Sequence, residues 1–137
     1  GGHRPRAGRG PGPDSADLNS PLLGAFALAY FRTVAVELPV LLFGLDRRHL
    51  VSDRIVNGLW LSAVTLPVVW FILPPLLPGS RLLYLVAAES FAALAEVGLF
   101  FWGRASAGVN PWLSARRDAA VIVAANLASF AVGTLVG

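Results

Sequence analysis

The residues of this chain with the clearest potential for chemistry are carboxylic acids inside apolar segments. Glu89 and Glu96 lie in the apolar run 84–102, and Glu37 lies in an earlier apolar run. Glu89 and Glu96 are seven positions apart, which is two helical turns, so on a helix their carboxyl groups share one face. Acids in such segments are costly and need a proton, a cation or a basic side chain as a partner. These three glutamates are therefore the candidate functional groups.

The composition indicates the environment in which these acids lie. The chain of 137 residues is 55% hydrophobic and 14% charged, which is too apolar for an ordinary soluble domain. Four apolar segments account for most of it, and a helix of about 20 residues spans the roughly 30 Å hydrocarbon core of a bilayer. The sequence therefore predicts an all-α polytopic membrane protein, with four transmembrane helices forming an antiparallel bundle in the lipid bilayer.

The predicted boundaries follow from composition and helix-start signals. Segment 1–19 is rich in glycine, proline and arginine, so it is predicted to be a disordered tail. The transmembrane domain is predicted over 20–137, starting at Ser20, an N-cap residue before Pro21. Because the chain contains no methionine, we expect a processed product or a segment of a longer chain. The spans are predicted at about 21–45, 55–77, 81–102 and 118–136.

Two prolines and a small-residue pattern predict how the helices bend and pack. Pro39 and Pro67 lie inside apolar spans. Each lacks the N–H that would bond the carbonyl one turn earlier, so both are predicted to kink their helices. In the last span, small residues recur every four positions at Ala125, Ser129 and Gly133. This spacing predicts a close helix–helix contact within the chain.

The placement of the arginines predicts the orientation in the membrane. The connectors after the first and third spans are arginine-rich, whereas the opposite side has Arg81 near a span and three more distant tail arginines. The positive-inside rule then places both long connectors in the cytoplasm and both termini outside a bacterial-type cytoplasmic membrane. The connector arginines are Arg47, Arg48, Arg54, Arg104, Arg116 and Arg117.

Helix register predicts two levels of polar residues inside the bilayer. Counted from the span midpoints at about 1.5 Å per residue, Glu37 and Glu96 lie at one depth. Arg32 and Glu89 lie slightly closer to the terminal side, near enough in depth to form a buried ion pair. Asn126 falls near the centre of the last span, where it can hydrogen-bond to these groups. Glu37 and Glu96 remain without a cation, and with Asn126 they form the candidate site for an ion, a proton or a partner's basic group.

A weak internal similarity links the two halves of the chain. Glu37 and Glu96 are each followed by a proline or glycine two positions later and by a glycine seven positions later. An asparagine lies in the next span of each half, Asn57 and Asn126. Two helical hairpins related by an axis along the membrane normal would produce this pattern, and so would coincidence in an apolar sequence.

Several kinds of chemistry are excluded or not expected. The absence of cysteine excludes disulfides, thiolate nucleophiles and cysteine-ligated metals. The two histidines are His3 in the tail and His49 in a charged connector, where it is expected to be solvated, so no metal site or cofactor is predicted. There is no catalytic motif, and three tail arginines are too few for a nucleic-acid site, so neither an enzyme nor a nucleic-acid partner is predicted.

Two functions remain open. The sequence favours a non-enzymatic structural or accessory subunit of a larger membrane assembly, whose acids pair internally or with a partner's basic residue. The alternative is a small proton- or cation-coupled transporter that acts as a homo-oligomer, with Glu37 and Glu96 as the coupling carboxylates and Asn126 as a neutral ligand. A water-accessible cavity at the acids would favour transport, whereas dry and fully paired acids would favour the subunit.

Overall fold

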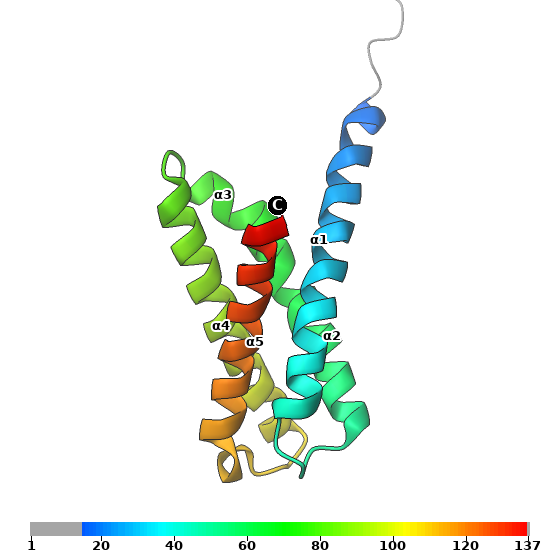
Figure 1. The fold of residues 1–137 in the computed structure, drawn as a ribbon, viewed down its shortest axis with the longest axis vertical. Coiled ribbons are helices and arrows are strands. Elements are labelled where there is room, and N and C mark those ends of the chain that lie inside the picture. Colours follow the sequence, from blue (N-terminus) through cyan, green and yellow to red (C-terminus); the bar gives the residue numbers. More distant parts are fainter. Residues whose placement is uncertain (1–14, 137) are drawn as a thin grey trace, which may run out of the picture.

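The fold was analysed in a computed structural model that describes residues 15–136, and this part of the chain is helical, without β-strands. Its four long helices run in alternating directions along the bundle (Figure 1). They are α1 (Ser15–Gly44), α2 (Val51–Pro67), α4 (Arg81–Ser106) and α5 (Ala115–Val136). The shorter elements are the π-helix η1 (Val68–Ile72), α3 (Leu73–Leu76) and the 3₁₀-helix η2 (Pro111–Leu113).

Four helical segments are long and apolar enough to cross a membrane, as expected for a multi-pass membrane protein. The second is continuous through α2, η1 and α3. The candidate spans are Pro21–Gly44, Val51–Leu76, Arg81–Ser106 and Ala115–Leu135.

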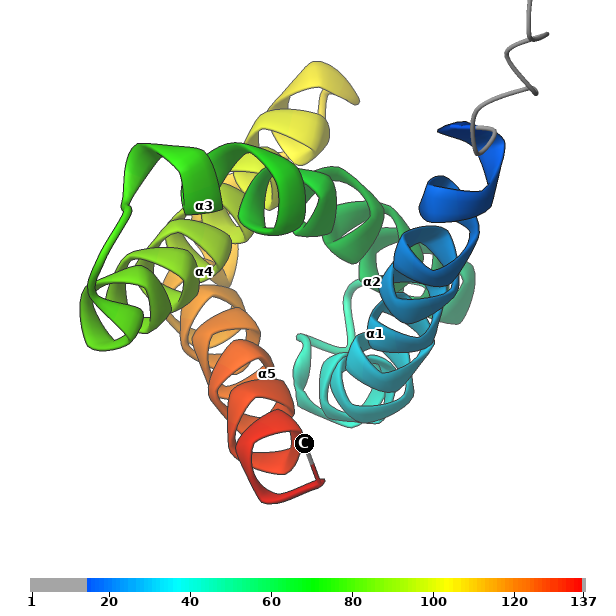
Figure 2. The same cartoon turned by 90° about the horizontal axis from the view of Figure 1, so that it is seen from above.

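The four helices form a ring rather than two separate hairpins. Helix α1 packs on α2 and α5, and α4 packs on the same two helices. Viewed along the bundle, α1 and α4 therefore lie diagonally opposite each other (Figure 2). Side chains on α1 and α4 consequently meet through groups on α2 and α5.

The two ends of the bundle differ. At the loop end, where the α1–α2 and α4–α5 connectors lie, the buried apolar core joins all four helices. At the opposite, splayed end, α1 diverges from α5 (Figure 1). The core consists of Leu41, Leu45, Leu61, Phe100, Ile122 and Ala125.

The two prolines predicted to kink their helices, Pro39 and Pro67, both lie in the α1–α2 hairpin, and regular α-helix ends only at Pro67. Helix α1 begins at Ser15, before the predicted N-cap residue Ser20, and continues through both Pro21 and Pro39 as one helix. Regular α-helix in the second span ends at Pro67, and the π-helix follows at once. Because Pro67 has no N–H, the α-helical hydrogen-bond pattern is interrupted there. The wider turn of the π-helix continues the helical segment past this interruption.

Two glycines lie at close helix approaches, whereas Gly133 of the predicted small-residue pattern does not. A Cβ on Gly58 would lie 2.9 Å from Cδ1 of Leu38, so α1 and α2 touch at this point. A Cβ on Gly44 would lie 2.6 Å from a methyl group of Val121. In α5, Ala125 is buried, but a Cβ on Gly133 would meet nothing within 4 Å. The predicted contact of Ala125, Ser129 and Gly133 therefore does not extend to Gly133.

We expect Gly58→Leu to destabilise the α1–α2 hairpin, because the new side chain must displace Leu38 and Leu41. Overpacking of this kind costs about 1–3 kcal/mol, measured as loss of thermal stability in detergent. Gly133→Leu is the matched control, since it makes the same helical substitution in open space. Equal melting temperatures for the two variants would contradict the close approach at Gly58.

Candidate functional site

Glu37 of α1 lies at the centre of the bundle and accepts hydrogen bonds from two neighbouring helices. Its side chain is only 2% exposed. The Ser62 hydroxyl of α2 lies 2.7 Å from Oε2, and the Ser129 hydroxyl of α5 lies 2.8 Å from Oε1. Each carboxyl oxygen therefore has one hydroxyl partner.

Glu96 of α4 has the corresponding environment on the other side of the ring. It too is 2% exposed. The Thr65 hydroxyl of α2 lies 3.0 Å from Oε1, and the side-chain amide of Asn126 in α5 donates to Oε2 at 2.8 Å. The structure thus brings the predicted residues Glu37, Glu96 and Asn126 into one hydrogen-bonded network.

The network is crossed between the two halves of the chain. Helix α2 contributes Ser62 and Thr65, and α5 contributes Asn126 and Ser129, in both cases three positions apart. Glu37 is bonded by Ser62, the first residue of the α2 pair, and by Ser129, the second of the α5 pair. Glu96 is bonded by Thr65, the second of the α2 pair, and by Asn126, the first of the α5 pair. This exchange is what a two-fold axis along the bundle would generate.

The crossed pattern changes which residue corresponds to Asn126. The internal similarity in the sequence pairs Asn126 with Asn57. The Asn57 amide instead donates to the Asp53 carbonyl in its own helix, at 2.6 Å. Ser62 occupies the position equivalent to Asn126. The sequence prediction missed Ser62 and Thr65 as partners of the acids, although the three-residue spacing that they share with Asn126 and Ser129 was a usable signal.

The hydroxyl groups of the network have a choice of acceptor. Ser62 Oγ lies 3.1 Å from the Gly58 carbonyl as well as near Glu37, and Ser129 Oγ lies 3.0 Å from the Asn126 carbonyl. A hydroxyl has one proton and two lone pairs. It can donate to an ionised carboxylate, or donate to the helix carbonyl and accept from a protonated carboxyl group. Glu37 therefore finds partners in both protonation states.

Glu96 is held more asymmetrically than Glu37. Thr65 Oγ1 lies 3.0 Å from the Leu61 carbonyl and so has the same choice of acceptor. The Asn126 amide nitrogen has no lone pair to offer, and its two protons point to Glu96 Oε2 and, at 3.1 Å, to the Ile122 carbonyl. Oε2 of Glu96 must therefore be an acceptor, and a proton on this residue belongs on Oε1, facing Thr65.

A small cavity of about 60 Å³ lies beside the network, large enough for water. Glu89 is half-buried and faces the same cavity, so three carboxyl groups meet there. No basic side chain of the described residues lines it. The other lining residues are Thr33, Thr65, Leu66, Val69, Ala88, Ala92, Asn126 and Ser129.

The predicted buried ion pair between Arg32 and Glu89 is wrong. Arg32 is exposed, and no ion pair joins it to an acid within residues 21–135. Arg32 and Glu37 are five positions apart, which at about 100° per residue puts them roughly 140° apart around α1. Because Glu37 faces inward, Arg32 faces outward. An arginine at the centre of a span costs about 3 kcal/mol on the insertion scale, so its outward direction needs an explanation.

A second buried polar cluster closes the loop end. His49, expected to be solvated, is only 5% exposed, and its Nε2 lies 2.7 Å from Oδ2 of Asp118. Asp118 is also hydrogen-bonded to the Asp46 backbone N–H and the Ser114 hydroxyl. His49 packs edge-on against Phe100. The prediction failed because it judged His49 by its charged sequence neighbours, whereas the carboxylate that holds it comes from α5.

Arginine side chains reinforce the same end. Arg54 donates to the backbone carbonyls of Leu42, Asp46 and His49. Arg117 donates to the Gly44 carbonyl at 3.0 Å, which ties α5 to the end of α1. The bonds to Leu42 and Gly44 satisfy carbonyl groups that the end of α1 leaves unpaired.

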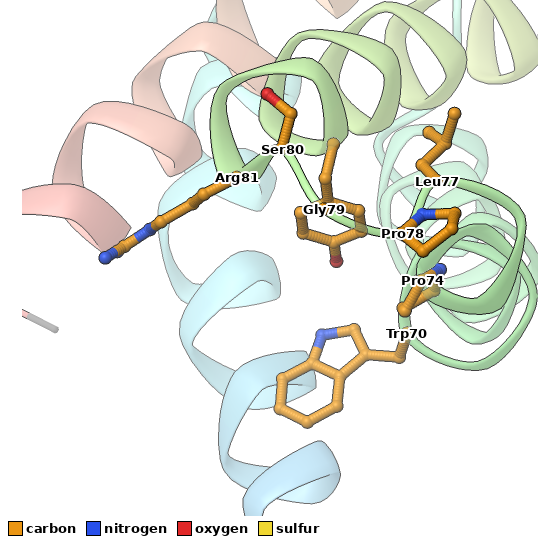
Figure 3. Close-up of a pocket in the computed structure, with 8 residues that line it drawn as sticks. Trp70, Pro74, Leu77, Pro78, Gly79, Ser80 and Arg81 are labelled. Atoms are coloured by element: carbon orange, nitrogen blue, oxygen red, sulfur yellow. The ribbon is translucent and has the colours of Figure 1, made fainter.

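A wider depression of about 470 Å³ lies at the splayed end, around the turn between α3 and α4. Trp70 and Tyr84 line it, and the Arg81 side chain extends away from Trp70 (Figure 3). The Tyr84 hydroxyl donates to the Val69 carbonyl at 3.1 Å. Val69 lines the carboxylate cavity, so this hydrogen bond joins a lining residue of each hollow.

Within the described residues, no group of three or more His, Asp or Glu side chains is arranged to hold a metal ion. The carboxyl groups of Glu37 and Glu96 are instead surrounded by hydroxyl and amide donors. The chemistry that this arrangement supports is the binding and release of protons, or of a small cation that replaces them.

Comparisons with models of protein families, with curated proteins and with solved structures find no match to this chain. The function is therefore inferred from the chemistry of the site.

We expect Asp118→Ala to loosen the loop end. The substitution leaves His49 and the Asp46 N–H buried without their acceptor, which costs about 2 kcal/mol or more. The measurement is thermal unfolding in detergent. Asp53→Ala is the matched control, because Asp53 is an exposed acid in the first turn of α2. Comparable losses in the two variants would show that Asp118 does not hold this end together.

Proposed function

We propose that this chain is a non-enzymatic membrane transporter for protons or a small cation, with Glu37 and Glu96 as its binding carboxylates. The observation that supports this most directly is the cavity that Glu37, Glu89 and Glu96 line and that no basic side chain of the described residues lines. Three acids at membrane depth without a counter-ion need protons or a cation. Hydroxyl partners that serve both protonation states allow Glu37 to gain and lose a proton without leaving a polar group unpaired.

Access to the acids is proposed from the splayed end. Every member of the buried apolar core lies on the loop side of the polar network. The core residues of α1 and α4 follow Glu37 and Glu96, and those of α2 and α5 precede Ser62 and Asn126. The cavity instead extends past Thr33, Val69 and Glu89, which lie on the splayed side of the acids. A transport cycle then requires the loop end to open, and the His49–Asp118 contact is the bond to be broken.

The orientation and the assembly remain part of this proposal. Arginines concentrated in the two long connectors support a cytoplasmic loop end, with both termini outside. The cavity within one chain is small. A pathway for anything larger than a proton would therefore be completed at the surface between copies in a homo-oligomer.

Proton or cation flux into liposomes that contain the purified chain tests the transport function. We expect the double variant Glu37→Gln/Glu96→Gln to reduce flux by roughly tenfold or more. Gln keeps the shape of the side chain, but it cannot release a proton or carry the negative charge that binds a cation. Asp53→Asn is the control, since it removes an exposed acid and should leave flux unchanged. Transport is refuted if the unmodified chain shows no flux, or if a folded double variant retains it.

A second function, that of an accessory subunit of a larger membrane assembly, is favoured by a different observation. Arg32 faces outward from the middle of α1, and it has no acidic partner among residues 21–135. An outward charge at this depth is typical of a surface that another membrane protein covers.

The subunit function predicts that the chain, extracted from its native membrane in mild detergent, migrates with a complex much larger than itself. Arg32→Leu should shift it to the size of the free chain, because the partner's counter-ion is then left unpaired. Arg81→Leu, at the end of a span, is the control. Migration of the unmodified chain only as itself or as a small homo-oligomer would contradict this function.

A further inference from the structure

We propose that the outward face of α1 around Arg32 binds a transmembrane helix of another protein that carries a carboxylate near the middle of the bilayer. This inference rests on the accessory-subunit function and specifies the chemistry of the partner. It does not depend on transport, because Arg32 lies outside the carboxylate cavity.

The depth of Arg32 excludes a partner at the membrane surface. Arg32 lies eleven positions after Pro21 and twelve before Gly44 in the span Pro21–Gly44, so it is near the middle of a hydrocarbon core about 30 Å thick. An extended arginine side chain reaches about 7 Å from its Cα. About 8 Å of hydrocarbon then separates the guanidinium from either headgroup layer. Lipid phosphates are therefore out of reach.

The acids that the structure describes at this depth in the same chain are also unavailable. Glu37 and Glu96 are buried and hydrogen-bonded inside the ring, and Glu89 faces the cavity. Helix α4, which carries Glu89 and Glu96, lies diagonally across the ring from α1 (Figure 2). A second copy presents the same inward-facing acids, so it offers no outward carboxylate to Arg32. The counter-ion must come from a different protein.

The surroundings of Arg32 fit a helix rather than a polar domain. Leu28 precedes it by one turn, while Ala35 and Pro39 follow on the same face of α1, and all three are exposed. Phe43 continues this face toward the loop end and is 87% exposed. A bulky apolar strip with a small residue beside one central arginine matches an apolar helix with one central acid.

Synthetic transmembrane peptides can test this chemistry without the native partner. Three Leu/Ala-rich peptides of equal length, with Asp, Asn or Leu at the centre, are labelled and mixed in phosphatidylcholine vesicles with the labelled full chain. Association is measured by energy transfer. We expect the Asp peptide to associate roughly fivefold more tightly than the Leu peptide, with the Asn peptide between them. This comparison uses the unmodified chain, so it does not depend on the folding of a variant.

Variants then locate the contact. Arg32→Leu should reduce association of the Asp peptide to the level of the Leu peptide, and Arg81→Leu should leave it unchanged. The proposal is overturned if the three peptides associate equally, or if Arg32→Leu has no effect. It is also overturned if Glu89→Gln increases association, since Glu89 would then hold Arg32 within the chain. Energy transfer between copies of the chain that requires Arg32 would overturn it too, because a second copy would then be the partner.

The peptide assay and the native extraction separate two kinds of failure. A large native complex without any preference for the Asp peptide would retain the subunit function and remove the carboxylate partner. A preference for the Asp peptide without a native complex would retain the surface and remove the subunit function.

Discussion

The cost of placing two carboxyl groups in the middle of an apolar bundle is the constraint on which the rest of this structure depends. Glu37 and Glu96 are both almost fully buried, and each obtains its two hydrogen bonds from α2 and α5. Because each acid takes one bond from each of these helices, α1 and α4 are held on opposite sides of the ring. The polar centre thus specifies which helices are neighbours, a choice that apolar packing in a membrane specifies poorly.

The two ends of the bundle follow from what lies on either side of that centre. Toward the loops, large apolar side chains and the buried His49–Asp118 contact fill the space between the helices. Toward the splayed end, the third acid, Glu89, and the cavity take the place of a packed core. Stability and access to the acids are thereby separated along one axis. A residue that stiffens one end has little direct contact with the other.

Much of this arrangement can be predicted from the sequence, because helix register determines depth. The four spans, the shared level of Glu37 and Glu96 and the central position of Asn126 all follow from counting residues along apolar segments. Depth alone says nothing about direction around the helix or about adjacency in the ring. For that reason the Arg32–Glu89 pair was wrong, although the two residues lie at similar depths. His49 was misjudged for a related reason, since its partner Asp118 is distant in sequence and close in space.

The crossed hydrogen bonds have a consequence for how such a chain changes over generations. Neither half can satisfy its own glutamate, because Glu37 needs Ser129 and Glu96 needs Thr65 from the opposite half. The segment α1–α2 is therefore an incomplete unit that must meet a second unit of the same kind. A substitution at Thr65 or Ser129 is felt by the acid of the other half, so the two halves must vary together. Descent from a symmetric pair of identical hairpins, later joined into one gene, would produce this mutual dependence from the start.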